Sequence, residues 1–308
     1  MKKYLAMAII AAFAVFLLPK GFNAVFSGRP PEKAQEEFTL ILISEDKTVT
    51  IPAEDYIVGC LFAQIDVSYE LEALKAQAAA AYTYALRLIE NGEELSDSVS
   101  YCQPYFTPKK AKEYYGDSYE KYLPVLKEAA EYGANHPIYY ENKPIYSVYH
   151  SVSAGATNRP EYVWGLSLPY LQRKDCPKDK EYKGFSAENE ITPEEVRQRL
   201  FAYDPTLEMP VDYSLWFTDT VKDENGYVTS AKIGEKTVSG GDLWRILKLR
   251  SAAFNIVWTG MNFNIATKGC GHGVGLSQFT ANEMAKEGKS AEEILTYFYE
   301  GAQVVCLS

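Results

Sequence analysis

The stretch from residue 71 to residue 92, LEALKAQAAAAYTYALRLIENG, constrains the fold more than any other part of this sequence. Its apolar residues recur at spacings of three and four, which is the pattern of one apolar face on an α-helix. They are Leu71, Leu74, Ala78, Ala81, Ala85 and Leu88. We expect Ser68 to cap the start of this helix and Asn91-Gly92 to end it. The alanine run from Ala78 to Ala81 either lets another element approach closely or reflects only the helix propensity of alanine.

Other stretches predict strands and further helices. FTLILIS (38–44) with KTVTIPA (47–53), and FNIVWTG (254–260) with MNFNIA (261–266), have the composition of paired strands. Residues 136–150 predict another hairpin, which turns at Glu141-Asn142. The capping-box patterns at 192–195 and 290–293 each predict the start of a helix. We therefore expect an α+β fold, a single mixed domain of antiparallel strands and helices over residues 38–308.

The N-terminus predicts a membrane anchor. Two lysines precede an apolar run from Tyr4 to Leu18, which is the pattern of an export signal. Only Lys20 interrupts the apolar continuation and no small-residue cleavage site follows, so we favour an uncleaved anchor over a cleaved signal peptide. We assign residues 1–27 to this segment and 28–37 to a polar linker. The rest of the chain is then expected on the extracytoplasmic face, tethered to the membrane.

Charge and cysteine content exclude several classes of function. The formal net charge of −10 would repel phosphate backbones, and no basic stripe offsets it, so no nucleic acid is expected as a partner. The five cysteines include no C-x-x-C pair, which argues against a disulfide framework and against a zinc ribbon. One pair could bridge in an oxidising compartment, and the sequence does not say which. We expect no metal and no cofactor.

The glycine-rich stretch KGCGHGVGLSQF, residues 268–279, is the first candidate for chemistry. It is no nucleotide loop, because Val274 stands where G-x-G-x-x-G requires glycine. Alternating glycines let a backbone pass close to a ligand that carries many hydroxyls or amides. The alternative is a tight strand-to-helix crossing in which His272 only hydrogen-bonds its neighbours. A second polar stretch, YHSVSAGATN (149–158), is either a turn or a loop of adaptable hydrogen-bonding hydroxyls.

These stretches together resemble one family. GHGVGLSQ (271–278), LEALKAQAAAAYTYAL (71–86), YHSVSAGATN (149–158) with VWG (163–165), and SYCQPY (100–105) are similar to motifs of the stage II sporulation protein D family. The resemblance spans roughly residues 38–305 and implies a peptidoglycan lytic transglycosylase that remodels the septal wall during sporulation. It also implies a partner amidase, stage II sporulation protein P. The expected ligand is the glycan strand of peptidoglycan.

The resemblance assigns site residues by motif. It implies that the glycine-rich stretch and the polar stretch line a cleft for the glycan. The residues that fall on the family's ligand-contact positions are Lys75, His150, His272, Ser277 and Gln278.

The catalytic position departs from the family. The family's glutamate lies in an A-E-M-P segment, and Gln64 stands at that place in this sequence. A lytic transglycosylase must protonate the leaving glycosidic oxygen and then help the muramic 6-hydroxyl close on C1, and an amide has no acid proton for this. We therefore expect weak cleavage or none. Asp66 and Glu70 are the candidates for a replacement acid, although Glu70 also suits the first turn of a helix.

Further departures accompany Gln64. They are scattered, which indicates natural divergence rather than a designed knockout. The residues concerned are Asp66, Tyr82, Ala154, Ala156 and Thr280.

Two other functions remain open. The chain could be a wall-binding scaffold of the engulfment machinery without any activity. Alternatively, Cys270 with His150 or His272 could form the nucleophile–base pair of a peptide or amide hydrolase, although no third group that would orient such a pair is apparent.

Overall fold

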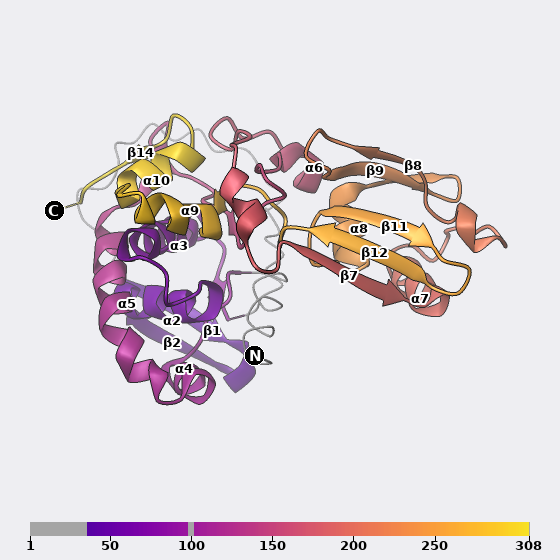
Figure 1. The fold of residues 1–308 in the computed structure, drawn as a ribbon. Helices are drawn as coiled ribbons and strands as arrows, with labels where there is room; N and C mark the ends of the chain where they lie inside the picture. The colour runs from indigo at the N-terminus through magenta and orange to yellow at the C-terminus, as the bar shows by residue number, and fades with distance from the viewer. Residues whose placement is uncertain (1–35, 98–101, 308) are drawn as a thin grey trace.

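The computed structural model describes residues 36–97 and 102–307, which form a helix-rich part and a β-rich part (Figure 1). One continuous cluster of buried apolar residues includes members from both parts, such as Leu74 and Trp216. The helices of the first part are α2 (Ala53–Gln64), α3 (Leu71–Glu90), α4 (Pro108–Tyr115), α5 (Ser118–Asn135), α9 (Gln278–Lys286) and α10 (Ala291–Phe298). The α+β class is confirmed.

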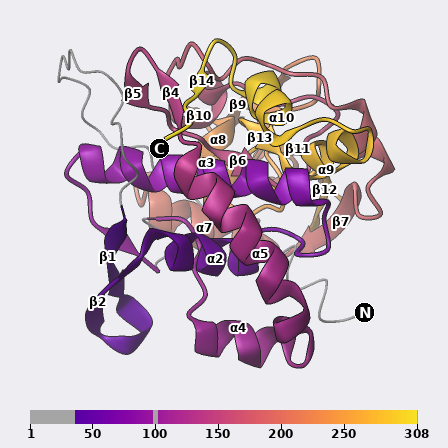
Figure 2. The same cartoon turned by 90° about the vertical axis from the view of Figure 1, so that its left-hand side faces the viewer.

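Helix α3 is the centre of the helix-rich part, and α5 crosses in front of it (Figure 2). A Cβ atom added at Gly133 of α5 would lie 2.7 Å from the Cβ of Ala78. The alanine run of α3 therefore does admit a close neighbour, as one of the two interpretations of that run predicted. The end of α3 is also confirmed, since Asn91 is its C-cap.

Helix α3 begins at Leu71, where the predicted periodic stretch begins, but the predicted cap by Ser68 is wrong. Glu70 is the N-cap residue and provides no side-chain cap. The Ser68 hydroxyl instead donates to the Asp66 carboxylate at 2.6 Å. An Asp-x-Ser turn of this kind satisfies the serine locally, so the serine is not available to the helix.

The first hairpin is confirmed and leads directly into a helix that the sequence did not predict. Strands β1 (Glu37–Leu42) and β2 (Lys47–Pro52) are antiparallel, with η1 (Ile43–Glu45) between them. Helix α2 follows Pro52 and buries ten of its twelve residues. Because it is apolar around its whole circumference, it lacks the one-sided pattern by which a surface helix is predicted.

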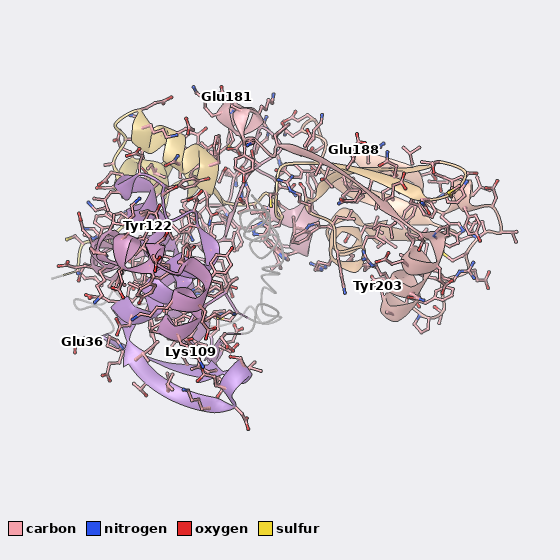
Figure 3. All side chains as sticks on the ribbon, turned by 60° about the horizontal axis from the view of Figure 1, so that its bottom comes forward. Glu36, Lys109, Tyr122, Glu181, Glu188 and Tyr203 are labelled. Carbon is pink, nitrogen blue, oxygen red and sulfur yellow. The ribbon has the colours of Figure 1, made fainter. Side chains whose placement is uncertain are left out.

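The β-rich part contains two three-stranded sheets. The predicted late hairpin is confirmed as β11 (Ala253–Trp258) paired with β12 (Phe263–Lys268). The side chains of Glu188 and Tyr203 mark this part in Figure 3, and those of Lys109 and Tyr122 mark the helix-rich part. The other elements of the β-rich part are α6 (Pro160–Trp164), β7 (Ser186–Ile191), α7 (Pro193–Tyr203), η3 (Tyr213–Leu215), β8 (Thr218–Lys222), β9 (Val228–Ile233), β10 (Lys236–Ser239) and α8 (Gly240–Ile246).

Both predicted helix starts are confirmed by cap geometry. The Thr192 side chain accepts from the Glu195 backbone at the start of α7. Ser290 and Glu293 form a complete capping box at the start of α10. A short polar side chain before the first turn satisfies backbone N–H groups that have no partner within the helix.

Short strands complete the helix-rich part, where they pair beside its helices. The predicted middle hairpin is confirmed as β4 (Ile138–Tyr140) and β5 (Lys143–Pro144), with Glu141 and Asn142 at its turn. Strand β6 (Tyr149–His150) pairs in parallel with β13 (Leu276–Ser277) and so joins the two stretches singled out in the sequence. The remaining elements are β3 (Leu95–Ser96), η2 (Pro177–Glu181) and β14 (Gln303–Val304).

The expected anchor, residues 1–27, and most of the linker lie outside the described residues. Within residues 36–97 and 102–307, no helix combines the length and apolar character needed to cross a membrane. The predicted domain boundaries therefore stay predictions.

Candidate functional site

Gln64 is the last residue of α2, and its side chain is only 5% exposed. The amide nitrogen donates to the Pro104 carbonyl oxygen at 2.7 Å. The amide oxygen accepts a hydrogen bond from the Tyr149 hydroxyl. The amide is therefore held at both ends inside the protein.

A second buried glutamine shares this network. Gln103 donates to the Ala81 carbonyl oxygen at 2.8 Å and to the Tyr56 hydroxyl at 2.9 Å. Its amide oxygen lies 2.6 Å from the Tyr149 hydroxyl. Because both amide nitrogens are directed at main-chain carbonyls, both amide oxygens are directed at Tyr149, whose single proton is shared between the two acceptors. Burial raises the pKa of Tyr149 well above its usual value, so this hydroxyl keeps its proton.

The backbone ties Gln64 to the glycine-rich stretch. Gln278 donates through Nε2 to the Gln64 carbonyl oxygen at 3.1 Å and to Gln77 Oε1 at 3.2 Å. Gln278 of the glycine-rich stretch and Gln77 of the 71–86 motif thus meet beside position 64. The side chains of this set are amides and tyrosine hydroxyls, so the network contains no carboxyl group.

His150 lies on the other side of strand β6 from this network. Successive side chains of a strand point to opposite faces, so Tyr149 is directed at Gln64 and His150 at the glycine-rich stretch. The ring centroids of His150 and His272 are 5.9 Å apart. The structure therefore brings the two histidines together, one strand away from the position-64 network.

Hydrogen bonds to Val274 set opposite tautomers on the two histidines. His150 Nδ1 lies 3.1 Å from the Val274 carbonyl oxygen, so this nitrogen carries the proton of the neutral ring. His272 Nδ1 accepts from the Val274 backbone N–H at 3.0 Å, so its proton is on Nε2. Burial lowers the pKa of His150 to about 4 and lowers that of His272 well below its usual value. Both rings are neutral at pH 7.

The glycines of this stretch pack against the protein itself. A Cβ atom at Gly275 would lie 2.0 Å from the Val148 carbonyl oxygen, and one at Gly273 would lie 2.4 Å from the Tyr227 hydroxyl. Both glycines also have positive φ, at 74° and 81°. These two positions therefore require glycine because of close packing within the protein. This supports the interpretation of the stretch as a tight strand-to-helix crossing.

Two tryptophans complete the surroundings of His272. The rings of Trp164 and Trp244 lie 5.0 and 6.2 Å from the His272 ring. Three ring nitrogens in this cluster are buried and have no hydrogen-bond partner among the described residues: His150 Nε2, Trp164 Nε1 and Trp244 Nε1. Such atoms usually bond water or a ligand.

Ser277 and Lys75, two of the predicted ligand contacts, are engaged inside the protein. Ser277 is fully buried, begins α9 as its N-cap, and donates to Asp179 at 2.8 Å. Lys75 forms ion pairs with Glu72 at 2.9 Å and with Glu128 of α5 at 3.7 Å. These contacts give both residues a role in joining elements of the helix-rich part.

The two candidate replacement acids are exposed. The Asp66 carboxylate accepts hydrogen bonds from the backbone and the hydroxyl of Ser68. Glu70 precedes α3, and its backbone N–H donates to the Asn282 side chain at 2.8 Å. Each carboxylate thus lies in solvent, whereas Gln64 is buried.

Cys270 is buried, and its pKa is raised by that burial. A thiol with a raised pKa is a poor nucleophile. None of the five cysteines forms a disulfide, and only Cys306 is exposed. No cluster of three or more metal-ligating side chains occurs in the described part of the chain.

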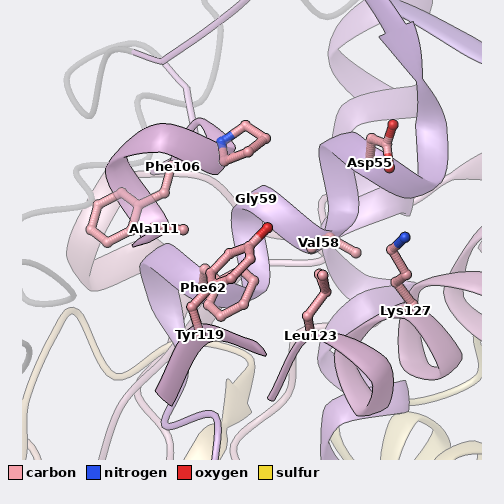
Figure 4. A pocket seen from close by; sticks show the side chains of 10 residues that line it. Asp55, Val58, Gly59, Phe62, Phe106, Ala111, Tyr119, Leu123 and Lys127 are labelled. Atoms are coloured by element: carbon pink, nitrogen blue, oxygen red, sulfur yellow. The ribbon is translucent and has the colours of Figure 1, made fainter. Parts of the chain in front are cut away.

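A hollow of about 210 Å³ lies between α2, α4 and α5 (Figure 4). Gln64 follows Phe62 of its lining by two residues, which places Gln64 on a different face of α2 because successive helix residues are about 100° apart. The wall of the hollow is mostly apolar and aromatic, with one carboxylate and one ammonium group. The lining residues are Asp55, Val58, Gly59, Phe62, Phe106, Pro108, Ala111, Tyr119, Leu123 and Lys127. The hollow is therefore separate from the residues that the sequence motifs single out.

Sequence reasoning missed three residues of this region. Tyr149 and Gln103 stand within quoted motifs, and only their contacts with Gln64 reveal their part in the network. Asp179 has no local signal at all, because it lies between two exposed lysines and reads as a surface residue.

Comparison with known proteins agrees with the motifs. A family model described as "Stage II sporulation protein" matches residues 44–140. The chain is 33% identical over 262 residues to stage II sporulation protein D of Bacillus subtilis (strain 168), covering 82% of this chain and 74% of that protein. It is 32% identical over 273 residues to the protein of the same name from Bacillus amyloliquefaciens, covering 85% and 76%. An amidase enhancer of Bacillus subtilis (strain 168) is 23% identical over 292 residues, covering 79% of this chain and 39% of that protein. The chain therefore belongs to the stage II sporulation protein D family, a family of sporulation proteins.

Proposed function

We propose that this chain binds the glycan strands of peptidoglycan and takes part in remodelling them during sporulation, with weak cleavage or none. The observation that carries the proposal is the state of Gln64. At the place of the family's glutamate stands a buried amide whose nitrogen and oxygen are both hydrogen-bonded within the protein. General acid–base assistance contributes about 10²–10⁴ in rate, so its loss leaves little turnover.

The cluster of rings around His272 supports glycan binding. Indole N–H groups donate and the unprotonated His150 Nε2 accepts, which matches a sugar hydroxyl because that group can do both. Since all three atoms are buried, the proposal requires the cluster to open when the glycan binds. Aromatic faces also suit the apolar faces of a pyranose ring. The proposal places the glycan at the junction of the helix-rich and β-rich parts.

The proposal also includes attachment to the membrane and an amidase partner. An N-terminal anchor would hold the chain at the extracytoplasmic face of the membrane, beside the peptidoglycan. Stage II sporulation protein P, an amidase, would act there on the same polymer. In this setting a chain that only binds would serve as a wall-binding scaffold, which is the second candidate function.

The Cys270 hydrolase is disfavoured by a specific observation. Burial raises the pKa of the Cys270 thiol and lowers the pKa of both nearby imidazoles. A nucleophile–base pair needs the opposite shifts, because the thiol must lose its proton to the imidazole.

Incubation with peptidoglycan tests the proposal. The full chain and its Gln64→Glu variant are mixed with purified peptidoglycan, and bound protein and 1,6-anhydro products are measured by sedimentation and mass spectrometry. We expect both proteins to bind and only Gln64→Glu to release anhydro products.

The Gln103→Glu variant is the matched control. It also places a carboxyl group beside Tyr149, but away from the family's catalytic position. Cleavage by Gln103→Glu equal to that of Gln64→Glu would contradict the assigned role of position 64. Absence of binding by the native chain would contradict the proposed ligand.

A further inference from the structure

Asp179 is a fully buried carboxylate in the short helix η2, and its neighbours Lys178 and Lys180 are exposed. No ion pair within residues 36–97 and 102–307 includes it. A buried charge without a cation is costly unless hydrogen bonds surround it. The hydrogen bonds that surround the Asp179 carboxylate therefore indicate its role in the protein.

Three donors from two segments of the chain converge on this carboxylate. The Ser153 backbone N–H donates at 2.6 Å, the Ser277 hydroxyl at 2.8 Å and the Thr280 hydroxyl at 2.6 Å. Ser153 follows His150 by three residues, and Ser277 follows His272 by five. Asp179 with these three donors is called the Asp179 clasp below.

The clasp also closes the start of helix α9. Ser277 is the N-cap residue, and its hydroxyl oxygen accepts from the Thr280 backbone N–H at 3.4 Å. A negative charge is favoured at a helix N-terminus, where unpaired N–H groups leave a partial positive charge. Asp179 thus lies where a carboxylate stabilises both the helix and the strand that leads into it.

Main-chain bonds carry this support to the histidines. Ser277 is paired with His150 in the β6–β13 ladder, and Val152 bonds Cys270 in both directions, at 2.7 and 3.3 Å. The two segments that present His150 and His272 are therefore joined along one side, and Asp179 fastens their ends.

One donor of the clasp is a departure from the family's motif. Thr280 stands where the resemblance leads one to expect glycine, and glycine has no hydroxyl to donate. The hydrogen bond from the Thr280 hydroxyl to Asp179 therefore depends on a residue in which this chain departs from the family's motif.

We propose that Asp179 is a positioning residue, which sets the relative place of the His150 and His272 rings and through them the affinity for glycan. The glycan part of this inference rests on the proposed function. The positioning part stands on the contacts alone.

The test compares Asp179→Asn and Thr280→Val with the native full chain. Each variant removes acceptor or donor capacity from the clasp with little change in side-chain volume. The ring ¹⁵N chemical shifts of both histidines are read by NMR, and binding to purified peptidoglycan is measured by sedimentation. For Asp179→Asn we expect displaced shifts of both rings and about tenfold weaker binding, as for a lost hydrogen bond to a charged group. For Thr280→Val we expect smaller changes in the same direction.

Ser290→Ala is the matched control. It removes the N-cap of α10, another helix of the same part, without touching the clasp. We expect the melting temperature of Ser290→Ala to fall about as far as that of Asp179→Asn. The ring ¹⁵N shifts of both histidines and the binding to peptidoglycan should stay as in the native chain.

Ring shifts in Asp179→Asn and Thr280→Val that match the native protein would overturn the inference. If Asp179→Asn does not fold, Thr280→Val alone decides by the same criterion. If the native chain does not bind peptidoglycan, the proposed function fails, whereas the ring shifts still decide the positioning role.

Discussion

Gln64 and Tyr149 show how hydrogen-bond directions restrict the chemistry of single residues. The Pro104 carbonyl can only accept, so the atom of residue 64 that faces it must donate. An amide meets this requirement through its nitrogen. A carboxyl group meets it only when protonated, which is also the form that a general acid requires. The surroundings of Gln64 therefore still suit a neutral acid.

A pH titration of Gln64→Glu tests this statement about the surroundings. We expect the pKa of the new carboxyl group to lie above the usual value for glutamate. The variant should match the native stability below about pH 4, where the carboxyl group is protonated in both states. Its stability should then fall as the pH rises through the raised pKa, by about 2 kcal/mol at pH 7. Urea unfolding at a series of pH values measures this, and a variant that is equally stable at all pH values would contradict it.

His150 gives a pH dependence of the opposite sign. Its pKa is lowered to about 4 by burial, so the folded state resists protonation. The stability contributed by the neutral ring is complete above the unfolded pKa of about 6.5 and is lost as the pH falls towards 4. We expect a loss of about 2 kcal/mol between pH 7.5 and pH 5. Urea unfolding should show that the free energy of unfolding of His150→Gln falls less than that of the native chain between pH 7.5 and pH 5. An equal fall in both proteins would contradict a neutral, buried His150 ring.

At the scale of elements, small residues set how closely the helices approach. Gly133 of α5 lies against Ala78 of α3, and a Cβ atom there would also come within 2.6 Å of the Ala78 backbone carbon. Because backbone atoms cannot rotate away, the helices would have to separate. The contact between α3 and α5 thus depends on a position without a side chain.

Substituting Gly133→Ala should destabilise the protein, although alanine is the better helix former. Overpacking of this kind costs about 1–3 kcal/mol, which exceeds the gain of up to about 1 kcal/mol from helix propensity. Glu131→Ala, at an exposed position of the same helix, should change stability by less than about 0.5 kcal/mol. Thermal unfolding compares the two, and a stabilised Gly133→Ala would show that the helices are not in close contact.

For the whole molecule, the sequence predicts what depends on local pattern. It yields α3, three hairpins and two capped helices, since each has a one-sided periodicity or a turn signal. It does not yield α2, which is buried on all sides, or the parallel pairing of β6 with β13, whose partners lie far apart in the chain. For the same reason it identifies position 64 by motif but not Tyr149 and Gln103 as its surroundings, nor Asp179 as the acceptor for Ser277.

The distribution of thiols tests this account of the core. Four of the five cysteines are buried and Cys306 is exposed. We expect iodoacetamide to modify Cys306 alone in the native protein and all five after unfolding, because buried thiols are both shielded and held protonated. Peptide mass spectrometry identifies the modified residues. Rapid modification of Cys270 in the native state would contradict its burial and revive the hydrolase.

The most direct test of the central claim is the rate at which the native chain releases 1,6-anhydro muramic ends from peptidoglycan, relative to Gln64→Glu at equal bound protein. We expect a native rate lower by about 10²-fold or more, because only the variant has a carboxyl proton to give at position 64. A native rate equal to that of the variant would show that another group, such as Asp66 or Glu70, supplies the proton.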